Sequence, residues 1–231
     1  MKSRLIILGC GSSVGTPRID GYWGRSNFRI KKNIRSRCSA VIVKGNNNIL
    51  IDTSPDLRQQ LLINKIKNVS SVLFTHEHAD QTNGLFELRP FFWKYKKKIN
   101  IFGNKITINS LKRSQKFLFK KSNSYPAIIK DHLIKKNFSL GEGKSKIFFK
   151  SVSLNHGDTK SIAYIFEKTA YLSDCKDFAI LRRNEFKNLN YLIIDCLKFI
   201  KHPSHFNLDQ CISIHYNLKP KKTILTNLSY D

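Results

Sequence analysis

The sequence predicts one mixed α/β (α+β) domain over residues 1–231, a layered sandwich with sheets inside and helices outside. Short apolar runs rich in β-branched residues recur in both halves of the chain, and single helical stretches lie between some of them. Neither a linker nor a low-complexity tract interrupts this pattern. With 41% hydrophobic and 25% charged residues, the 231-residue chain has the composition of a globular protein with a sizeable core.

The strands are predicted from apolar runs that are bounded by turn signals. Two of these signals are the hairpin loop at Gly45 to Asn48 and a tight turn at Lys168-Thr169. The predicted strands are Leu5–Leu8, Ala40–Val43, Ile49–Ile51, Val72–Phe74, Ile99–Phe102, Ile147–Leu154, Ile162–Phe166, Ala170–Leu172, Tyr191–Ile194 and Thr223–Leu225.

Helices are predicted where apolar residues recur at helical spacing. The first, Asp56 to Lys65, follows Ser54-Pro55, where Ser54 is expected to be the N-cap and Pro55 the first helical residue. The other predicted helices are Ile106 to Phe119, Asp177 to Phe186 and Leu208 to Tyr216. The lysine-rich stretch from Ser122 to Asn137 has the weakest pattern and is interpreted as a solvated connector.

The net charge of +25 points to anionic partners, although lysine runs are more often solvated surface than binding sites. We expect a small anionic phosphodiester as the partner and favour nucleic acid less. No apolar stretch is long enough for a membrane span, so no membrane association is expected. Five scattered cysteines without C-x-x-C spacing fit a cytoplasmic location.

The most informative segment is a His-x-His-x-Asp cluster directly after an apolar strand. Val72–Phe74 runs through Thr75 into His76, His78 and Asp80. Alternate residues that leave a strand can point the same way, and imidazole and carboxylate groups are ligands of first-row metals. A lone histidine is usually structural, whereas two histidines and a carboxylate within five residues predict a metal site.

Three later strands also end in residues of the ligand type. His156 follows the strand that ends at Leu154, Asp174 follows the one that ends at Leu172, and Asp195 follows Ile194. Each of them alone is explained as an ordinary strand-end polar residue. Their shared placement favours a joint role in one site.

These segments resemble the metallo-β-lactamase superfamily, and specifically its phosphodiesterase branch for cyclic sugar phosphates. The resemblance extends almost from end to end, through Gly9 to Pro17, Asn33 to Ser39, Asp52 to Asp56, Thr75 to Arg89, Ser173-Asp174-Cys175 and His202 to Asp209. It implies an αββα sandwich of two mixed sheets with helices on the outer faces. It also implies a first metal held by His76, His78 and His156, with Asp174 bridging to a second metal and Asp80 binding that second metal.

The chain departs from the family pattern at the second metal. Gln81, a weak amide ligand, stands where the superfamily has a histidine, and the late histidine that is expected after the last strand is missing from the segment Thr226 to Asp231. We therefore expect Zn²⁺ or Mn²⁺ in one tight site and a second site that is weak or empty. The stretch Gly21 to Ser26 lacks the cysteines of the branch's structural zinc, so that zinc is not expected.

The expected chemistry is attack by a metal-bound hydroxide on a small cyclic sugar phosphate or nucleotide. Asp80 would orient the water, and His205 would protonate the leaving oxygen or hold the phosphate, unless it is merely a cap or surface residue. Candidate phosphate clamps are Arg35, Arg37, Arg58 and Arg89, although each of them alone is more often a salt-bridge partner of a nearby carboxylate. The glycine-rich loop Gly9 to Gly15 is a further candidate for anion binding through its backbone N–H groups.

Two other functions stay open at this point. One is an RNA-processing enzyme like ribonuclease Z, which the positive charge favours but no long inserted arm supports. The other is a catalytically impaired ligand-binding relic, which the incomplete second metal site favours. A homodimer is also open, because a partner's residue can replace a missing histidine.

Overall fold

A computed structural model describes the whole chain, Met1–Asp231, which divides into two compact units. The first unit comprises residues 1–8, 39–135 and 140–146. The second comprises residues 9–38, 136–139 and 147–231. The expectation of a single domain over the whole chain stays a prediction.

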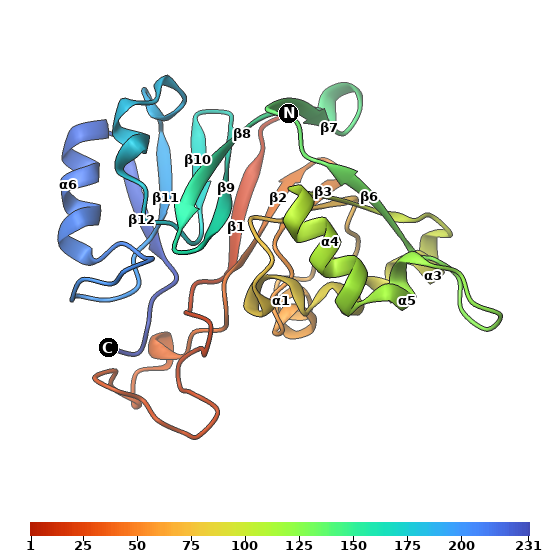
Figure 1. Ribbon diagram of the computed structural model, residues 1–231, viewed down its shortest axis with the longest axis horizontal. Helices are drawn as coiled ribbons and strands as arrows, with labels where there is room; N and C mark the ends of the chain where they lie inside the picture. The colour runs from red at the N-terminus through yellow and green to blue at the C-terminus, as the bar shows by residue number, and fades with distance from the viewer. The chain divides into compact units, whose positions relative to one another are not determined.

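The first unit is built on a six-stranded mixed sheet in the order β1-β2-β3-β4-β5-β6 (Figure 1). Its strands are β1 (Arg4–Gly9), β2 (Ser39–Lys44), β3 (Asn47–Ile51), β4 (Ser71–Leu73), β5 (Ile99–Gly103) and β6 (Ile129–Leu133). β2 and β3 form an antiparallel hairpin, whereas β3 to β6 pair in parallel. Gly45 turns that hairpin with a φ of +60°, a conformation that glycine adopts without strain.

Helices cover the apolar side chains of this sheet. They are α1 (Leu57–Ile63), the short α2 (Ala79–Thr82), α3 (Arg89–Tyr95), α4 (Lys105–Ser114) and α5 (Lys116–Phe119), and a 3₁₀ turn at Leu85–Leu88 leads into α3. α4 begins at Asn104, whose side chain accepts a hydrogen bond from the N–H of Thr107 at 2.8 Å. It buries Ile108 and Leu111 in the core that Val72 and Ile101 of the strands share.

The second unit contains the other six-stranded mixed sheet, in the order β12-β11-β10-β9-β8-β7. Its strands are β7 (Asn137–Leu140), β8 (Ile147–His156), β9 (Thr159–Phe166), β10 (Thr169–Leu172), β11 (Tyr191–Asp195) and β12 (Lys222–Thr226). β8, β9 and β10 form an antiparallel meander, and β10, β11 and β12 pair in parallel. β8 ends at His156 and β11 ends at Asp195, whereas β10 ends two residues before Asp174.

α6 (Leu208–Leu218) lies against this second sheet (Figure 1). It buries Cys211, Ile214 and Leu218 in the core of the second unit. Its first turn is fixed by a capping box, in which Asn207 and Gln210 bond each other's backbone N–H groups. The cap positions the loop before the helix, which carries His202 and His205.

All ten predicted strands are present, but the prediction of a connector from Ser122 to Asn137 was wrong in part. β6 lies within this stretch and pairs in parallel with β5, and β7 begins at its end. Both are edge strands of their sheets, and the sequence Ile-Lys-Asp-His-Leu of β6 lacks a continuous apolar run.

Two helix predictions also need correction. The segment Asp177 to Phe186 forms two short 3₁₀ helices, Phe178–Arg182 and Asn184–Phe186, instead of one α-helix. α1 begins at Leu57 with Asp56 as its N-cap, so Ser54 is not the cap. The Ser54 hydroxyl instead accepts from the Asp56 N–H at 3.2 Å and donates to Gln60 Oε1 at 2.9 Å.

Further helices were not predicted at all. α2 and α3 are short, and α3 begins at Arg89-Pro90 and contains no buried residue, so no apolar helical stripe announces it. A helix with the length and apolar composition of a membrane span does not occur in the structure.

Candidate metal centre

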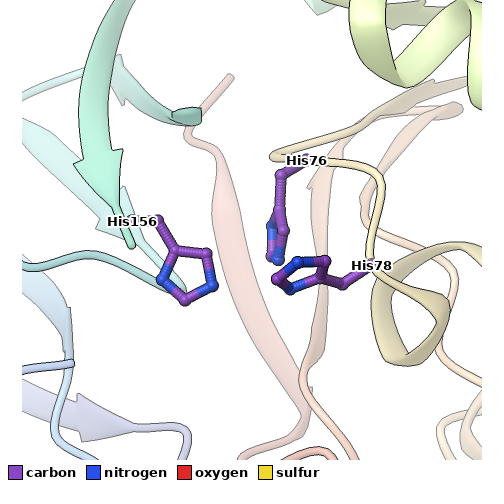
Figure 2. A group of neighbouring side chains, drawn as sticks. All are labelled: His76, His78 and His156. Carbon is purple, nitrogen blue, oxygen red and sulfur yellow. The ribbon is translucent and has the colours of Figure 1, made fainter. Parts of the chain in front are cut away.

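The first unit presents His76 and His78 on the loop after β4. Figure 2 draws their side chains together with that of His156, which lies at the end of β8. The His76 and His78 rings are 4.5 Å apart between centroids and are inclined at 74°. His76 is fully buried and His78 is exposed. The expectation that these alternate residues lie together is confirmed within this unit.

A buried hydrogen-bond chain orients His76. The Asp52 carboxylate accepts from the Thr75 N–H at 2.7 Å and from the Thr75 hydroxyl at 2.8 Å. The same hydroxyl oxygen lies 3.0 Å from His76 Nδ1. Asp52 has a φ of +60°, a strained value for a non-glycine residue, directly after β3. Sequence reasoning did not find this role of Asp52 and Thr75, although both stand in segments that carried the family resemblance.

Asp80 and Gln81 lie at the start of α2, where they contact each other. Gln81 Nε2 donates to Asp80 Oδ2 at 2.9 Å, and the Gln81 side chain is buried. The loop closes on α1 through Gly84, since a Cβ built there would lie 2.0 Å from the Ser54 carbonyl oxygen. Only glycine allows this approach.

The second unit brings together His156, Asp174 and His205. Each of these residues offers one ligand atom, and the three atoms lie within 4.8 Å of one another. His156 Nδ1 lies 3.1 Å from the Ser204 carbonyl oxygen, a contact that fixes the orientation of the ring. Two imidazoles and a carboxylate in a largely buried setting suit Zn²⁺ or Mn²⁺.

Asp195 is fully buried and supports this group through hydrogen bonds. His205 Nδ1 lies 2.8 Å from Asp195 Oδ2, and the Cys175 N–H donates to the same oxygen at 3.0 Å. Burial raises the pKa of Asp195 to about 7, while the His205 hydrogen bond acts in the opposite direction. The sequence had marked Asp195 only as one of several strand-end carboxylates.

Asn227 joins the two carboxylates. Its Nδ2 donates to Asp174 Oδ1 at 2.9 Å and to Asp195 Oδ1 at 3.0 Å. The same nitrogen lies 3.2 Å from His205 Nδ1. Sequence reasoning noted only that a histidine is missing from the segment Thr226 to Asp231, and no local pattern predicts these contacts of Asn227.

The proposed phosphate clamps have different surroundings. Arg89 is half-buried, with its guanidinium carbon 3.3 Å from the centre of the Phe86 ring and its Nε donating to the Phe86 carbonyl. Arg35 is half-buried and donates to Asn33 Oδ1 at 3.5 Å. Arg37 is half-buried and forms a β-bridge with Gly11. Substrate binding by these arginines stays a prediction.

Three N–H groups of the Gly9 to Gly15 loop are used within the protein, and anion binding by the rest of the loop stays a prediction. The N–H groups of Gly11, Ser12 and Gly15 donate to the carbonyl oxygens of Ser36, Leu228 and Ser12. A Cβ at Gly11 would lie 2.8 Å from the Arg35 carbonyl oxygen. These N–H groups therefore stabilise the loop itself.

Comparison with known families agrees with this arrangement. The model of the β-lactamase superfamily domain matches residues 47–226, a range that takes in both His-x-His-x-Asp and the His156 group. The chain belongs to the β-lactamase superfamily.

Three similar proteins illustrate the relationship. A diphosphatase of the PhnP family has a crystal structure that aligns with a TM-score of 0.86 and 29% identity, covering 100% of this chain and 88% of that one. Zn²⁺-bound PqqB from Methylobacterium extorquens aligns with a TM-score of 0.76 over 99% of this chain and 90% of that one; at 13% identity it shows the fold alone. A protein of Porphyromonas gingivalis named octanoyltransferase is 29% identical over 229 residues, 98% of this chain and 46% of its own length. The chain thus spans about half the length of that curated relative.

These findings confirm the predicted fold class, two mixed sheets with helices in the metallo-β-lactamase arrangement. The residues of the His156, Asp174 and His205 group are of types that can hold a metal ion.

Proposed function

We propose that this superfamily member is a metal-dependent phosphodiesterase that hydrolyses a small cyclic sugar phosphate or nucleotide. The observation that carries the proposal is the grouping of His156 and Asp174, as metal ligands, with His205, which Asp195 orients for proton transfer. The similarity to a PhnP-family diphosphatase supports a phosphate substrate, and the net charge of +25 favours an anionic one.

The residues fit the metal that the family implies. We propose that His76 and His78 join His156 and Asp174 in holding one Zn²⁺ or Mn²⁺ ion tightly. When bound, such an ion supplies hydroxide at neutral pH by lowering the pKa of water. Asp52 and Thr75 keep His76 in one orientation, and the Ser204 carbonyl does the same for His156.

Proton transfer falls to His205 in this proposal. Its Nδ1 lies 2.8 Å from the Asp195 carboxylate, which stabilises the protonated ring and aligns it. A protonated His205 then donates its proton to the departing sugar oxygen as the P–O bond breaks. Asp80 orients the attacking water, and Arg35, Arg37 and Arg89 stay candidates for phosphate binding.

Steady-state turnover of three probes tests the substrate class. We expect the purified chain with added Zn²⁺ or Mn²⁺ to hydrolyse 2′,3′-cyclic AMP faster than it hydrolyses ADP or cleaves a tRNA precursor. Preferential tRNA cleavage would favour the hypothesis of a ribonuclease, and preferential ADP hydrolysis would favour that of a diphosphatase. Octanoyl transfer is not carried over from the longer relative.

A matched pair of variants tests the site. His156→Ala is expected to abolish turnover. His215→Ala, which removes an α6 ring that is hydrogen-bonded to Thr223 of β12, is expected to leave turnover unchanged. Equal activity of His156→Ala and the unaltered protein would overturn the proposed site. A folded chain that binds metal and turns over none of the three probes would instead support a ligand-binding relic.

A further inference from the structure

The Asp174 and Asp195 carboxylates form a buried pair. Asp174 is 4% exposed and Asp195 is fully buried, and one nitrogen atom, Asn227 Nδ2, is within hydrogen-bond distance of both. Like charges so close in a buried site repel each other and lose their hydration. The pair therefore needs positive charge or strong donors between its members.

Asn227 supplies those donors. A carboxamide nitrogen carries two hydrogens, and carboxylates accept only, so one N–H serves Asp174 Oδ1 and the other serves Asp195 Oδ1. His205 Nδ1 is then the donor to Asp195 Oδ2. The amide nitrogen thus lies between two carboxylates and an imidazole. These three surrounding groups are of the types that bind a cation.

The first unit repeats this arrangement with its own residues. Gln81 Nε2 donates to Asp80 Oδ2 at 2.9 Å from a fully buried side chain. In this unit too, an amide N–H faces a carboxylate, and the carboxylate is of the type that binds a metal ion. A neutral amide donor thus faces Asp80 in the first unit and Asp174 in the second, where the Ser173 hydroxyl also donates to Asp174 Oδ2 at 2.7 Å.

We propose that the Asn227 carboxamide takes the place of a second cation and limits the site to one metal ion. This inference rests on the proposed function, because it concerns the number of ions in the same centre. An amide N–H repels a cation, whereas an acceptor at the same position would complete a ligand set with Asp174. Asn227 is thus a positioning residue that sets metal number.

Metal stoichiometry tests the inference directly. Equilibrium dialysis against matched free Zn²⁺, followed by elemental analysis, is carried out on the full chain and on Asn227→Asp and Asn227→His. We expect one ion per chain for the unaltered protein and two for either variant. Asn217→Asp is the matched control, since it makes the same change at an exposed position on α6 and should leave the value at one.

The outcomes separate this inference from the proposed function. Two ions in the unaltered chain, or one ion in both folded Asn227 variants, would overturn the inference alone. No ion in the unaltered chain would overturn the proposed metal function itself.

A second measurement covers the case in which neither variant folds. The side-chain ¹⁵N–¹H signals of Asn227 are followed in the unaltered chain as Zn²⁺ is added to saturation. We expect them to persist, protected from solvent exchange. Their loss on addition of the metal would overturn the inference, because the amide would then have been displaced.

Discussion

Replacing Thr75 with valine tests whether the buried chain from Asp52 to His76 prepares the metal site. Valine keeps the shape of threonine and removes the hydroxyl, which donates to Asp52 Oδ2 at 2.8 Å and lies 3.0 Å from His76 Nδ1. In this variant the fully buried Asp52 carboxylate keeps the hydrogen bond from the backbone N–H of residue 75 at 2.7 Å. It loses the hydrogen bond from the hydroxyl.

The expected magnitude follows from these contacts. Loss of a hydrogen bond to a buried charged group costs about 2–3 kcal/mol of the free energy of unfolding, which urea unfolding without metal measures. Loss of a group that orients a metal-ligating histidine weakens metal binding roughly 10- to 100-fold, or about 1.4–2.7 kcal/mol. Isothermal titration with Zn²⁺ measures this second effect separately.

Two controls isolate the hydroxyl's role. Thr75→Ser retains the hydroxyl and should restore most of the Zn²⁺ affinity. Thr223→Val removes a hydroxyl that lies 2.9 Å from Nδ1 of His215, a histidine outside the proposed centre, so Zn²⁺ affinity should not change. A folded Thr75→Val protein that binds Zn²⁺ within twofold of the unaltered chain would refute the reasoning.

Three other predictions concern stability. Gly84→Ala brings a Cβ to 2.0 Å from the Ser54 carbonyl oxygen and should cost about 3 kcal/mol in urea unfolding, whereas Gly103→Ala, with contacts of 3.4 Å or more, should cost much less. Saturation with Zn²⁺ at 100 times its Kd should raise the free energy of unfolding by about 2.7 kcal/mol, and His156→Ala should lose this gain. Burial lowers the pKa of His132, so the unfolded chain binds more protons than the folded chain below about pH 6.5. The free energy of unfolding should therefore decrease as the pH drops below 6.5. His132→Gln should flatten this dependence in urea unfolding between pH 5 and 8. An NMR titration that places the His132 pKa above 6.5 would contradict the last prediction.

Much of the fold followed from local patterns. β4 and β11 lie within short apolar runs of the sequence, at the places where those runs predict strands. β6 was not predicted, because an edge strand with Lys130, Asp131 and His132 in its middle has no apolar run. Its pairing with β5 forms only in the folded sheet.

The candidate site divides in the same way. The residue types of the site and their places at strand ends can be predicted from local sequence, since the spacing in His76, His78 and Asp80 is a local property of the chain. The position of Asn227 between Asp174 and Asp195, residues 53 and 32 positions away, arises on folding. The physical reason is that a hydrogen-bond partner is chosen by distance and direction in space, and those are set when β10, β11 and β12 pair, far beyond the range of any local pattern.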